Sequence, residues 1–281
     1  MPIPSEAVPP DLSAECPIVV ARASMVMRWD LLTFLHWDFD PELIQRLLPP
    51  GLAVDTFHGR AWVGLVPFLM EVRLPRGPAV PWLSRFCETN VRTYATAPDG
   101  SRGVWFLSLD AARLPAVVAA RQAYRLPYLW SAMTLDHATS ATSGQPADVS
   151  NDVSNGQIYS YTCQRRWPGP RGTRSRVKVR VGERYGTHEL GDLDHFLTAR
   201  WRLYSHHRRG LRSALAAHQP WPLHRAEVLD LDDQLFAVAG LPAPTAAPLV
   251  HWSPGVEVRI GYPRRLAGSA PSAGSAPSAG Q

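Results

Sequence analysis

Hydrophobic and polar residues alternate with a period of two over much of this chain, the pattern typical of β-strands. Two segments, 61–72 and 103–110, are apolar at odd and even positions alike, as in strands that are buried on both faces. The 27 prolines and 20 glycines favour many short strands joined by turns over a mainly helical chain. The pattern predicts strands at residues 61–72, 86–95, 103–110, 157–167, 175–185 and 255–263.

Short helices are expected between these strands. Residues 40–51 begin with Asp40 in an N-cap position and Pro41 at the first helical position, and Pro49, Pro50 and Gly51 end the helix. Further helices are predicted at 111–124, 192–201 and 231–242, a strand at 201–205 and a turn at 253–256. Many antiparallel strands with a few helices packed outside predict an α+β fold, arranged as a barrel or a sandwich.

A chain of 281 residues is long enough for a sizeable core, and we expect a single domain over residues 25–266. Three segments are polar or repetitive and predict disorder. They are residues 1–24, a flexible insert at 136–156 with a tandem "DVSN" repeat, and a tail at 267–281 that contains "GSAPSA" twice.

Charge and cysteine content narrow the class of protein. The net charge is +5, but the basic residues are almost all arginines spread along the chain, and Lys178 is the single lysine. Three widely spaced cysteines predict neither a disulfide framework nor a zinc site, which favours a reducing cytoplasm. No basic leader and no run of about 18 apolar residues occurs, so we expect a soluble, cytoplasmic protein that does not act at a membrane. A homo-oligomer is compatible with the sequence.

The strand predicted at 86–95, "FCETNVRTYA", carries unusual chemistry on one face. Because strand side chains alternate, Glu88, Asn90, Arg92 and Tyr94 share that face. The face is either the solvated side of a sheet or the lining of an interior cavity. Neighbouring strands are apolar on both faces, which indicates a central strand, where buried charges need partners. In the cavity interpretation, Glu88 and Arg92 point inward and interact directly, through Asn90 or through water.

Two other clusters give weaker signals. Four histidines, at positions 206, 207, 218 and 224, lack helical spacing and an acidic partner, so no metal site is predicted. The arginine-rich segment 164–185 suits either nucleic-acid binding or a solvated hairpin with Val177, Val179 and Val181 inward. We favour the hairpin, because no recognition helix or RNA-binding motif accompanies the charge.

Several segments together resemble one family. In order, they are "WDLLTFLHWDFDPELIQRLLPPGLAVDTFHGRAWVGLVPFLM", "FCETNVRTY", "GVWFLSLDA", "YRLPY", "FLTARWRLYS" and "VHWSPGVEVRIGYP". They are similar to the YqjF-like family of uncharacterised bacterial proteins, a domain of unknown function, over about Trp29 to Pro263. That family is grouped with the acetoacetate decarboxylase-like superfamily. The resemblance implies a mainly antiparallel, double-psi-like closed β-barrel or cone around a ligand cavity.

The resemblance also implies where a site lies. Decarboxylases of this superfamily use a Schiff-base lysine with a second lysine beside it, a glutamate on a central strand and an arginine near the first helix. By position the glutamate is Glu88, the arginine region holds His36 and Trp37, and the lysine region, "AYRLPYLW" (123–130), has no amine. Lys178 is out of phase with its inward neighbours and is expected in solvent. We therefore reject Schiff-base decarboxylation and expect no cofactor, since arginine is not nucleophilic.

The expected cavity is lined by Glu88, Asn90, Arg92, His36, Trp37 and Tyr128, with Asp110 and Tyr94 as further candidates. Its favoured function is to bind a small carboxylate or hydrophobic ligand, with Arg92 clamping a carboxylate. The alternative is a lyase or hydratase acting on a small oxo acid. There Glu88 is the general acid or base, and Tyr128 and His36 donate to an enolate-like oxygen. A third candidate function is nucleic-acid binding through residues 164–185.

Overall fold

Strands form at each segment where the sequence pattern predicted one, and also at 23–39, 128–139, 210–218 and 224–233, where none was predicted. The computed structural model describes residues 15–73, 84–139, 155–186, 188–207 and 210–266. Its strands are β1 Ala23–Phe39, β2 Ala53–Val54, β3 Thr56–Phe57, β4 Arg60–Arg73, β5 Arg85–Thr96, β6 Arg102–Ala111, β7 Tyr128–Thr139, β8 Gln157–Trp167, β9 Arg174–Arg184, β10 Arg202–His207, β11 Gly210–His218, β12 His224–Asp233, β13 Leu249–Gly261 and β14 Arg264–Arg265. The helices are α1 Pro41–Gln45, α2 Leu114–Ala123, α3 Asp192–Thr198 and α4 Leu235–Val238.

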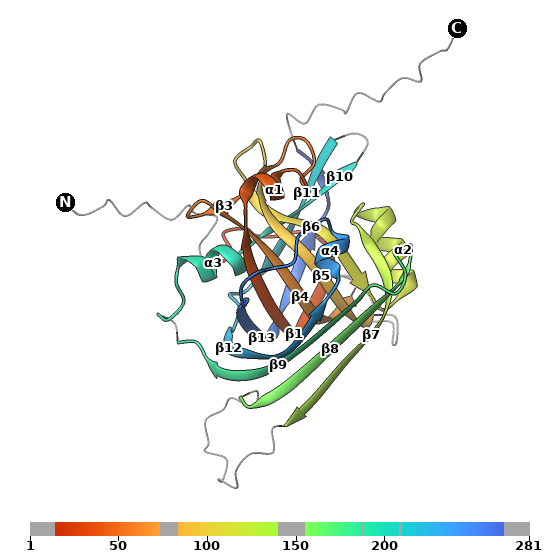
Figure 1. Cartoon of the computed structure of the whole chain (residues 1–281). Helices are drawn as coiled ribbons and strands as arrows, with labels where there is room; N and C mark the ends of the chain where they lie inside the picture. The colour runs from red at the N-terminus through yellow and green to blue at the C-terminus, as the bar shows by residue number, and fades with distance from the viewer. Residues whose placement is uncertain (1–14, 74–83, 140–154, 187, 208–209, 267–281) are drawn as a thin grey trace, which may run out of the picture.

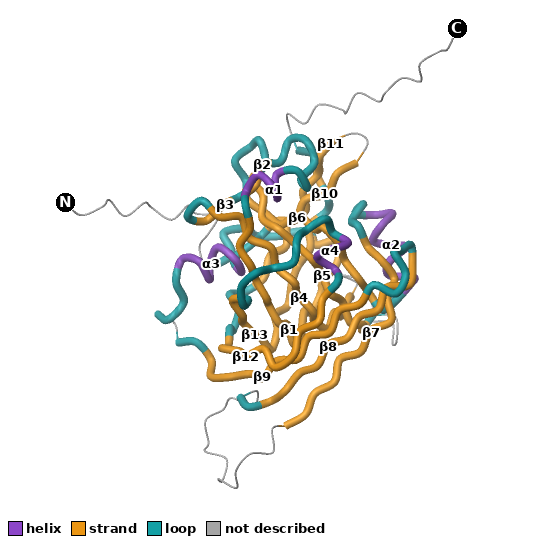
Figure 2. Tube along the Cα trace, in the orientation of Figure 1, coloured by secondary structure: helices purple, strands orange, loops and turns teal. Residues whose placement is uncertain are grey.

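The strands pair into two closed circuits that share one wall (Figures 1 and 2). The shared wall consists of β13, β1, β4, β5 and β6. Strands β10 and β11 close a smaller circuit, because β10 pairs with β6 and β11 pairs with β13. Strands β7, β8, β9 and β12 close a larger ring of nine strands. Most pairings are antiparallel, and β6 pairs in parallel with both β7 and β10. The expected closed, mainly antiparallel barrel is confirmed.

Each circuit encloses its own core, and alternation along the shared wall assigns residues to one or the other. In β4, Val66, Phe68 and Met70 point into the smaller circuit, which we call the barrel interior. Val63 and Leu65 of the same strand point into the nine-strand ring, called the second core below. Both faces of the wall are therefore buried, as the continuous apolar runs of these strands predicted.

An extra residue in β1 changes its alternation halfway along the strand. The pairing of β1 with β4 shifts by one residue between Asp30 and Leu35, and Leu31 in between has a positive φ of 52°. Before this bulge odd-numbered residues face the barrel interior, as Trp29 does; beyond it even-numbered residues such as Phe34 do.

Three predictions of local structure need correction, and a fourth, on the N-terminal segment, follows below. The turn expected at 253–256 lies inside β13, where Gly255 has a φ of 129° and allows the strand to bend without ending. The helix expected from 231 begins only at Leu235, since 231–233 complete β12. Strand β7 continues to Thr139 and pairs with β8, so part of the insert expected at 136–156 is regular structure; residues 140–154 lie outside the described part of the chain.

The N-terminal segment expected to be disordered also includes ordered residues. Val20 is buried, its carbonyl accepts a hydrogen bond from Arg259, and β1 begins at Ala23. Residues 1–14 and the tail at 267–281 lie outside the described residues.

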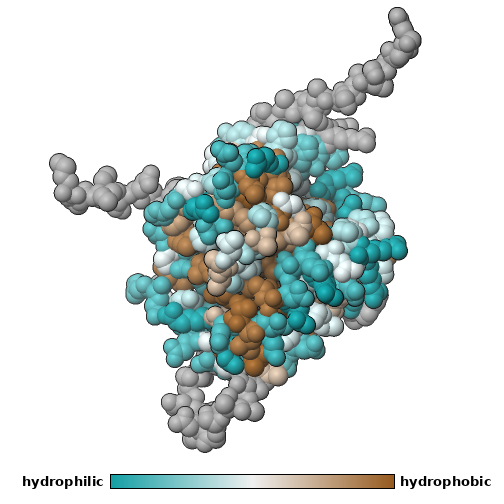
Figure 3. Space-filling view, viewed as in Figure 1, coloured by the Kyte–Doolittle hydropathy of each residue, from teal (hydrophilic) through white to brown (hydrophobic). Residues whose placement is uncertain are grey.

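Helices cover the open sides of the two circuits. Leu235 and Phe236 of α4 pack into the second core, where Phe236 meets Trp37 edge to face at 5.1 Å. Val117 of α2 packs into the barrel interior. Figure 3 shows hydrophobic side chains in a band down the middle of the face that carries α4, with hydrophilic flanks. None of the helices in the described part of the chain is both long and apolar enough to span a membrane.

Candidate functional site

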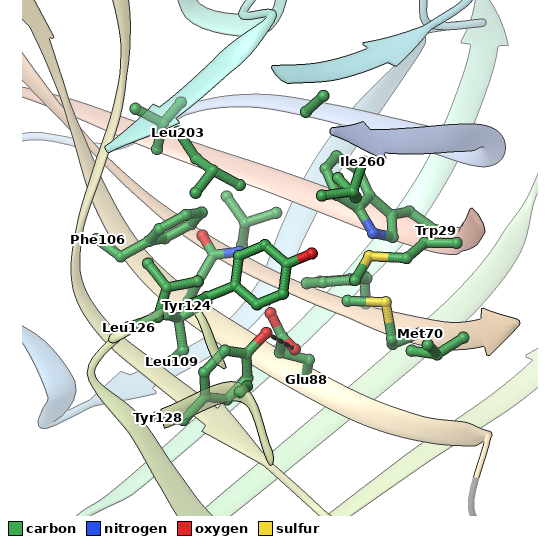
Figure 4. A pocket seen from close by; sticks show the side chains of 18 of the residues that line it. Trp29, Met70, Glu88, Phe106, Leu109, Tyr124, Leu126, Tyr128, Leu203 and Ile260 are labelled. Atoms are coloured by element: carbon green, nitrogen blue, oxygen red, sulfur yellow. Dashed lines mark hydrogen bonds between the residues drawn. The ribbon is translucent and has the colours of Figure 1, made fainter. Parts of the chain in front are cut away.

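A cavity of about 430 Å³ lies in the barrel interior (Figure 4). This volume is within the range of small-molecule sites. Most of its wall is apolar, with the largest contributions from the first half of β1, from β4, from β6 and from α2. Three polar side chains of β5, Glu88, Asn90 and Arg92, line the cavity, and other elements add further polar groups, among them Tyr124, Tyr128, Thr198, Arg200, Arg202 and His218. The cavity interpretation of the polar face at 86–95 is therefore the one that the structure supports.

Glu88 is buried in the cavity wall and is the one carboxylic acid among the described lining residues. The phenol of Tyr128, at the start of β7, donates a hydrogen bond to Oε2 of Glu88 at 3.0 Å, and Figure 4 shows the pair. Burial raises the pKa of Glu88 from 4.5 to about 8, against the lowering effect of the Tyr128 hydrogen bond. Glu88 is therefore mainly protonated at neutral pH.

Arg92 has no carboxylate partner among the described residues. Its Nη2 donates to the carbonyl of Leu197 at 3.2 Å and to the hydroxyl of Tyr94 at 3.4 Å, while its Nε–H is buried and has no acceptor. Asn90 Oδ1 is also buried without a donor. Of the ways in which Glu88 and Arg92 were expected to interact, the direct contact is not found among the described residues, because Glu88 accepts from Tyr128 and Arg92 donates to Leu197 and Tyr94.

His36 and Tyr94 lie on the inward face but behind the cavity wall. The Tyr94 hydroxyl donates to the carbonyl of Leu197 at 2.7 Å, so His36 Nε2, 2.7 Å away, is the donor to Tyr94. Burial and the charge of Arg92 lower the pKa of His36 well below its ordinary value. His36 and Tyr94 thus form a hydrogen-bonded layer that contacts Arg92 from behind the cavity wall. The expectation that they line the cavity is wrong.

Trp37 and Asp110 face away from the barrel interior. Trp37 follows His36 on the strand and so points into the second core, where its indole donates to the Ala246 carbonyl. Asp110 is buried, accepts from Ser131 and forms a two-pronged ion pair with Arg165 at 2.6 and 2.9 Å. The expectation that Trp37 and Asp110 line the cavity is wrong, because they occupy the opposite face of their strands.

The residues that sequence reasoning missed form most of the apolar wall. Met25, Met27 and Trp29 alternate along the start of β1, directly after the segment 1–24 that was predicted to be disordered. Their period of two was the signal that could have identified them. His218 and Trp221 also line the cavity, and no pattern near them pointed inward.

The four histidines considered as metal ligands are separated by the fold. His218 lines the cavity, His224 lies edge to face against Trp252 at 5.3 Å, and positions 206 and 207 lie in β10. In the described part of the chain, no group of three histidine, cysteine, aspartate or glutamate side chains is arranged to hold a metal ion.

Part of the charge of the arginine-rich hairpin is neutralised by the neighbouring strand β12. Strand β9 pairs with the acidic strand β12, and arginines at 174, 176 and 180 form ion pairs with Asp232, Asp230 and Glu227. The expected inward valines of β9 lie in the second core. Lys178 is exposed on the same strand, as predicted, and is not part of the cavity. The hairpin is thus a solvated face with alternating charge, which disfavours the nucleic-acid function.

The chain is similar in sequence to a family of uncharacterised proteins. The model of the DUF2071 family, described as "Uncharacterized conserved protein", matches residues 26–257. The "Uncharacterized protein YqjF" of Bacillus subtilis (strain 168) is 30% identical over 239 residues, covering 84% of this chain and 90% of that protein.

Two enzymes of known structure have a similar fold. The enduracididine biosynthesis enzyme MppR with HEPES buffer bound has a TM-score of 0.61 at 14% identity, over 89% of this chain and 90% of its own. The same enzyme has been solved in complex with pyruvate. An acetoacetate decarboxylase-like enzyme from Sphingomonas wittichii RW1 has a TM-score of 0.58 at 16% identity, over 89% of this chain and 95% of its own. At these low sequence identities, the structural similarity shows the fold alone.

Proposed function

This chain belongs to the DUF2071 family, and we propose that it binds a small carboxylate with an apolar body in the cavity of its barrel. Arg92 holds the carboxylate, and the methionine and aromatic wall holds the apolar body. The proposal keeps the superfamily's cavity and leaves out its imine chemistry, because the single lysine is exposed on β9.

The unpaired charge of Arg92 carries the proposal. A buried cation is costly unless it is paired, and the one acid on the described cavity wall, Glu88, is mainly neutral at pH 7. Arg92 retains an Nε–H without an acceptor. A carboxylate ligand would satisfy that donor and neutralise the charge through charge-assisted hydrogen bonds.

The rest of the wall suits an apolar body of variable shape. Met25, Met27 and Met70 are flexible and polarisable side chains that adapt to irregular surfaces. Trp29 and Phe68 add rigid aromatic surface, with ring centroids 6.1 Å apart. The complex of MppR with pyruvate, a small carboxylate, lends support to this ligand class.

Calorimetric titration tests the proposal with butanoate, octanoate and dodecanoate, and with octanol as the uncharged match. We expect a carboxylate of the series to bind, and octanoate to bind more tightly than octanol. Arg92→Met should weaken octanoate binding by about 10- to 100-fold, the value of a hydrogen bond to a charged group, and leave octanol unchanged. Arg180→Met, which removes an exposed arginine on β9, is the matched control.

Two outcomes would overturn the proposal. One is that no carboxylate of the series binds the unaltered protein. The other is that octanoate binds Arg92→Met as tightly as the unaltered protein. If Arg92→Met does not fold, Arg92→Lys keeps the charge but loses the planar fork, and should show an intermediate affinity for octanoate.

The Glu88–Tyr128 pair favours a second candidate function, general acid–base catalysis by a lyase or hydratase on a small oxo acid. A carboxyl group with a pKa of about 8 can both give and take a proton near neutral pH. Tyr128 at 3.0 Å holds its orientation.

Proton exchange tests this candidate. Incubation of 2-oxooctanoate with the protein in D₂O should replace the hydrogens next to the keto group with deuterium, as followed by proton NMR. Glu88→Gln should abolish the enzyme-dependent exchange while octanoate binding persists. Exchange at the rate of the buffer alone would refute the catalytic role and leave the binding proposal intact.

A further inference from the structure

The cavity wall contains a hydrogen-bond acceptor that a simple carboxylate does not use. His218, the last residue of β11, is 7% exposed and lines the cavity. Its ring lies among three indoles, with centroids 4.5 Å from Trp201, 4.9 Å from Trp221 and 6.2 Å from Trp29. These contacts hold the ring at a defined angle to the cavity.

One hydrogen bond determines which nitrogen of His218 carries the proton. Nδ1 lies 2.7 Å from the carbonyl oxygen of Gln219. A carbonyl oxygen accepts and never donates, so Nδ1 carries the hydrogen. Burial and the nearby charge of Arg92 lower the pKa of His218 to about 4, which keeps the ring neutral. In a neutral ring with Nδ1–H, the other nitrogen, Nε2, is an acceptor.

In the described part of the chain, Oδ1 of Asn90 is buried and receives no hydrogen bond, and the hydrogen bond of the His218 ring is made at Nδ1, which leaves Nε2 available as an acceptor. Both residues line the same cavity as Arg92. Two acceptors of the cavity wall, Oδ1 of Asn90 and Nε2 of His218, are therefore available to a ligand that also meets the cation Arg92. A ligand that brings a donor as well as a carboxylate gains a hydrogen bond to one of these acceptors, which a carboxylate alone cannot form.

We infer that the ligand of the cavity is a hydroxy acid, whose carboxylate meets Arg92 and whose hydroxyl donates to Nε2 of His218. The inference rests on the proposed function and narrows its ligand class. A keto oxygen accepts only, so an oxo acid leaves Nε2 without a donor, and a plain fatty acid does the same. A hydroxyl group supplies the donor and also accepts, for example from the buried Nε1–H of Trp29, which has no acceptor.

Calorimetry with four acids of one chain length tests the inference on the unaltered protein: octanoate, 2-oxooctanoate, 2-hydroxyoctanoate and 3-hydroxyoctanoate. At least one hydroxy acid should bind about tenfold more tightly than octanoate, and 2-oxooctanoate should gain nothing. This comparison needs no variant, so it stands whether or not any substituted protein folds.

Substitution at His218 assigns the gain to its side chain. His218→Phe keeps a flat ring but removes the acceptor, and should bring the hydroxy acid to the affinity of octanoate while octanoate itself still binds. His218→Gln, which carries an amide oxygen at a similar reach, should restore part of the gain. His137→Phe, at an exposed position of β7, is the control and should leave every affinity unchanged.

The outcomes separate the two proposals. If none of the acids binds, the proposed function fails and the inference fails with it. If octanoate binds and neither hydroxy acid binds more tightly, the inference alone is overturned. It is also overturned if the gain persists in a folded His218→Phe protein.

Discussion

Replacement of Glu88 by glutamine should change how the stability of this protein depends on pH. In the unfolded chain Glu88 releases its proton near the ordinary pKa of 4.5, and in the folded protein near 8. Between these values the folded state binds one more proton than the unfolded state. The free energy of unfolding therefore falls as pH rises, since stability decreases wherever the folded state holds the extra proton.

The structure gives the size of the effect. The interval from 4.5 to about 8, at about 1.4 kcal/mol per pH unit, corresponds to a loss of about 5 kcal/mol from this one group. The contribution of the neutral carboxyl is fully present below pH 4.5 and is lost by about pH 8. Glutamine stays neutral and still accepts from Tyr128, so the variant should match the unaltered protein near pH 4.5 and exceed its stability by several kcal/mol at pH 8.

Urea unfolding at intervals from pH 4.5 to 9 measures this difference directly, with ΔG extrapolated to zero denaturant. Glu227→Gln, on the exposed face of β12, is the control and should give no comparable rise in stability with pH. If the gap between Glu88→Gln and the unaltered protein stays constant from pH 4.5 to 8, then Glu88 is ionised in the fold. The argument that Arg92 faces a neutral acid would then fail.

Three further predictions concern the frame of the site and the rejected chemistry. Arg165→Leu leaves buried Asp110 without its partner and should cost about 3–5 kcal/mol in urea unfolding; a loss under 1 kcal/mol would contradict the buried pair. Gly255→Ala should cost more than about 2 kcal/mol, because φ is 129° and a Cβ would collide with the carbonyl oxygen of Trp29; an unchanged melting temperature would refute this. Borohydride with acetoacetate should trap no adduct, and mass spectrometry that finds a reduced imine at Lys178 would restore the decarboxylase reading.

The alternation of side chains along β5 predicted which residues share one face of that strand, but it did not predict which residues of other strands reach the cavity. Glu88, Asn90 and Arg92 were placed together because they share one face of a strand with apolar neighbours. The same rule shows why His36 and Trp37 could not both line the cavity, since adjacent strand residues point to opposite faces. Spacing alone does not say which side of a wall is hollow when both sides are buried.

Other features depend on contacts distant in sequence. The phenol of Tyr128 reaches Glu88 across 40 positions, and His218 enters the wall from a different strand pair. The bulge at Leu31 reverses the alternation of β1 without any glycine or proline to mark it. These placements follow from the closure of the two circuits, which no local window of sequence contains.

The wall shared by the two circuits separates two tasks along each of its strands. On β4, Val66, Phe68 and Met70 shape the ligand space, whereas Val63 and Leu65 hold the second core together. An engineer could therefore reshape the cavity by substituting every second residue and leave the neighbouring positions to keep the scaffold folded. Proteins with this architecture could likewise diverge in ligand preference through substitutions at every second residue of a shared strand, because only those residues face the cavity.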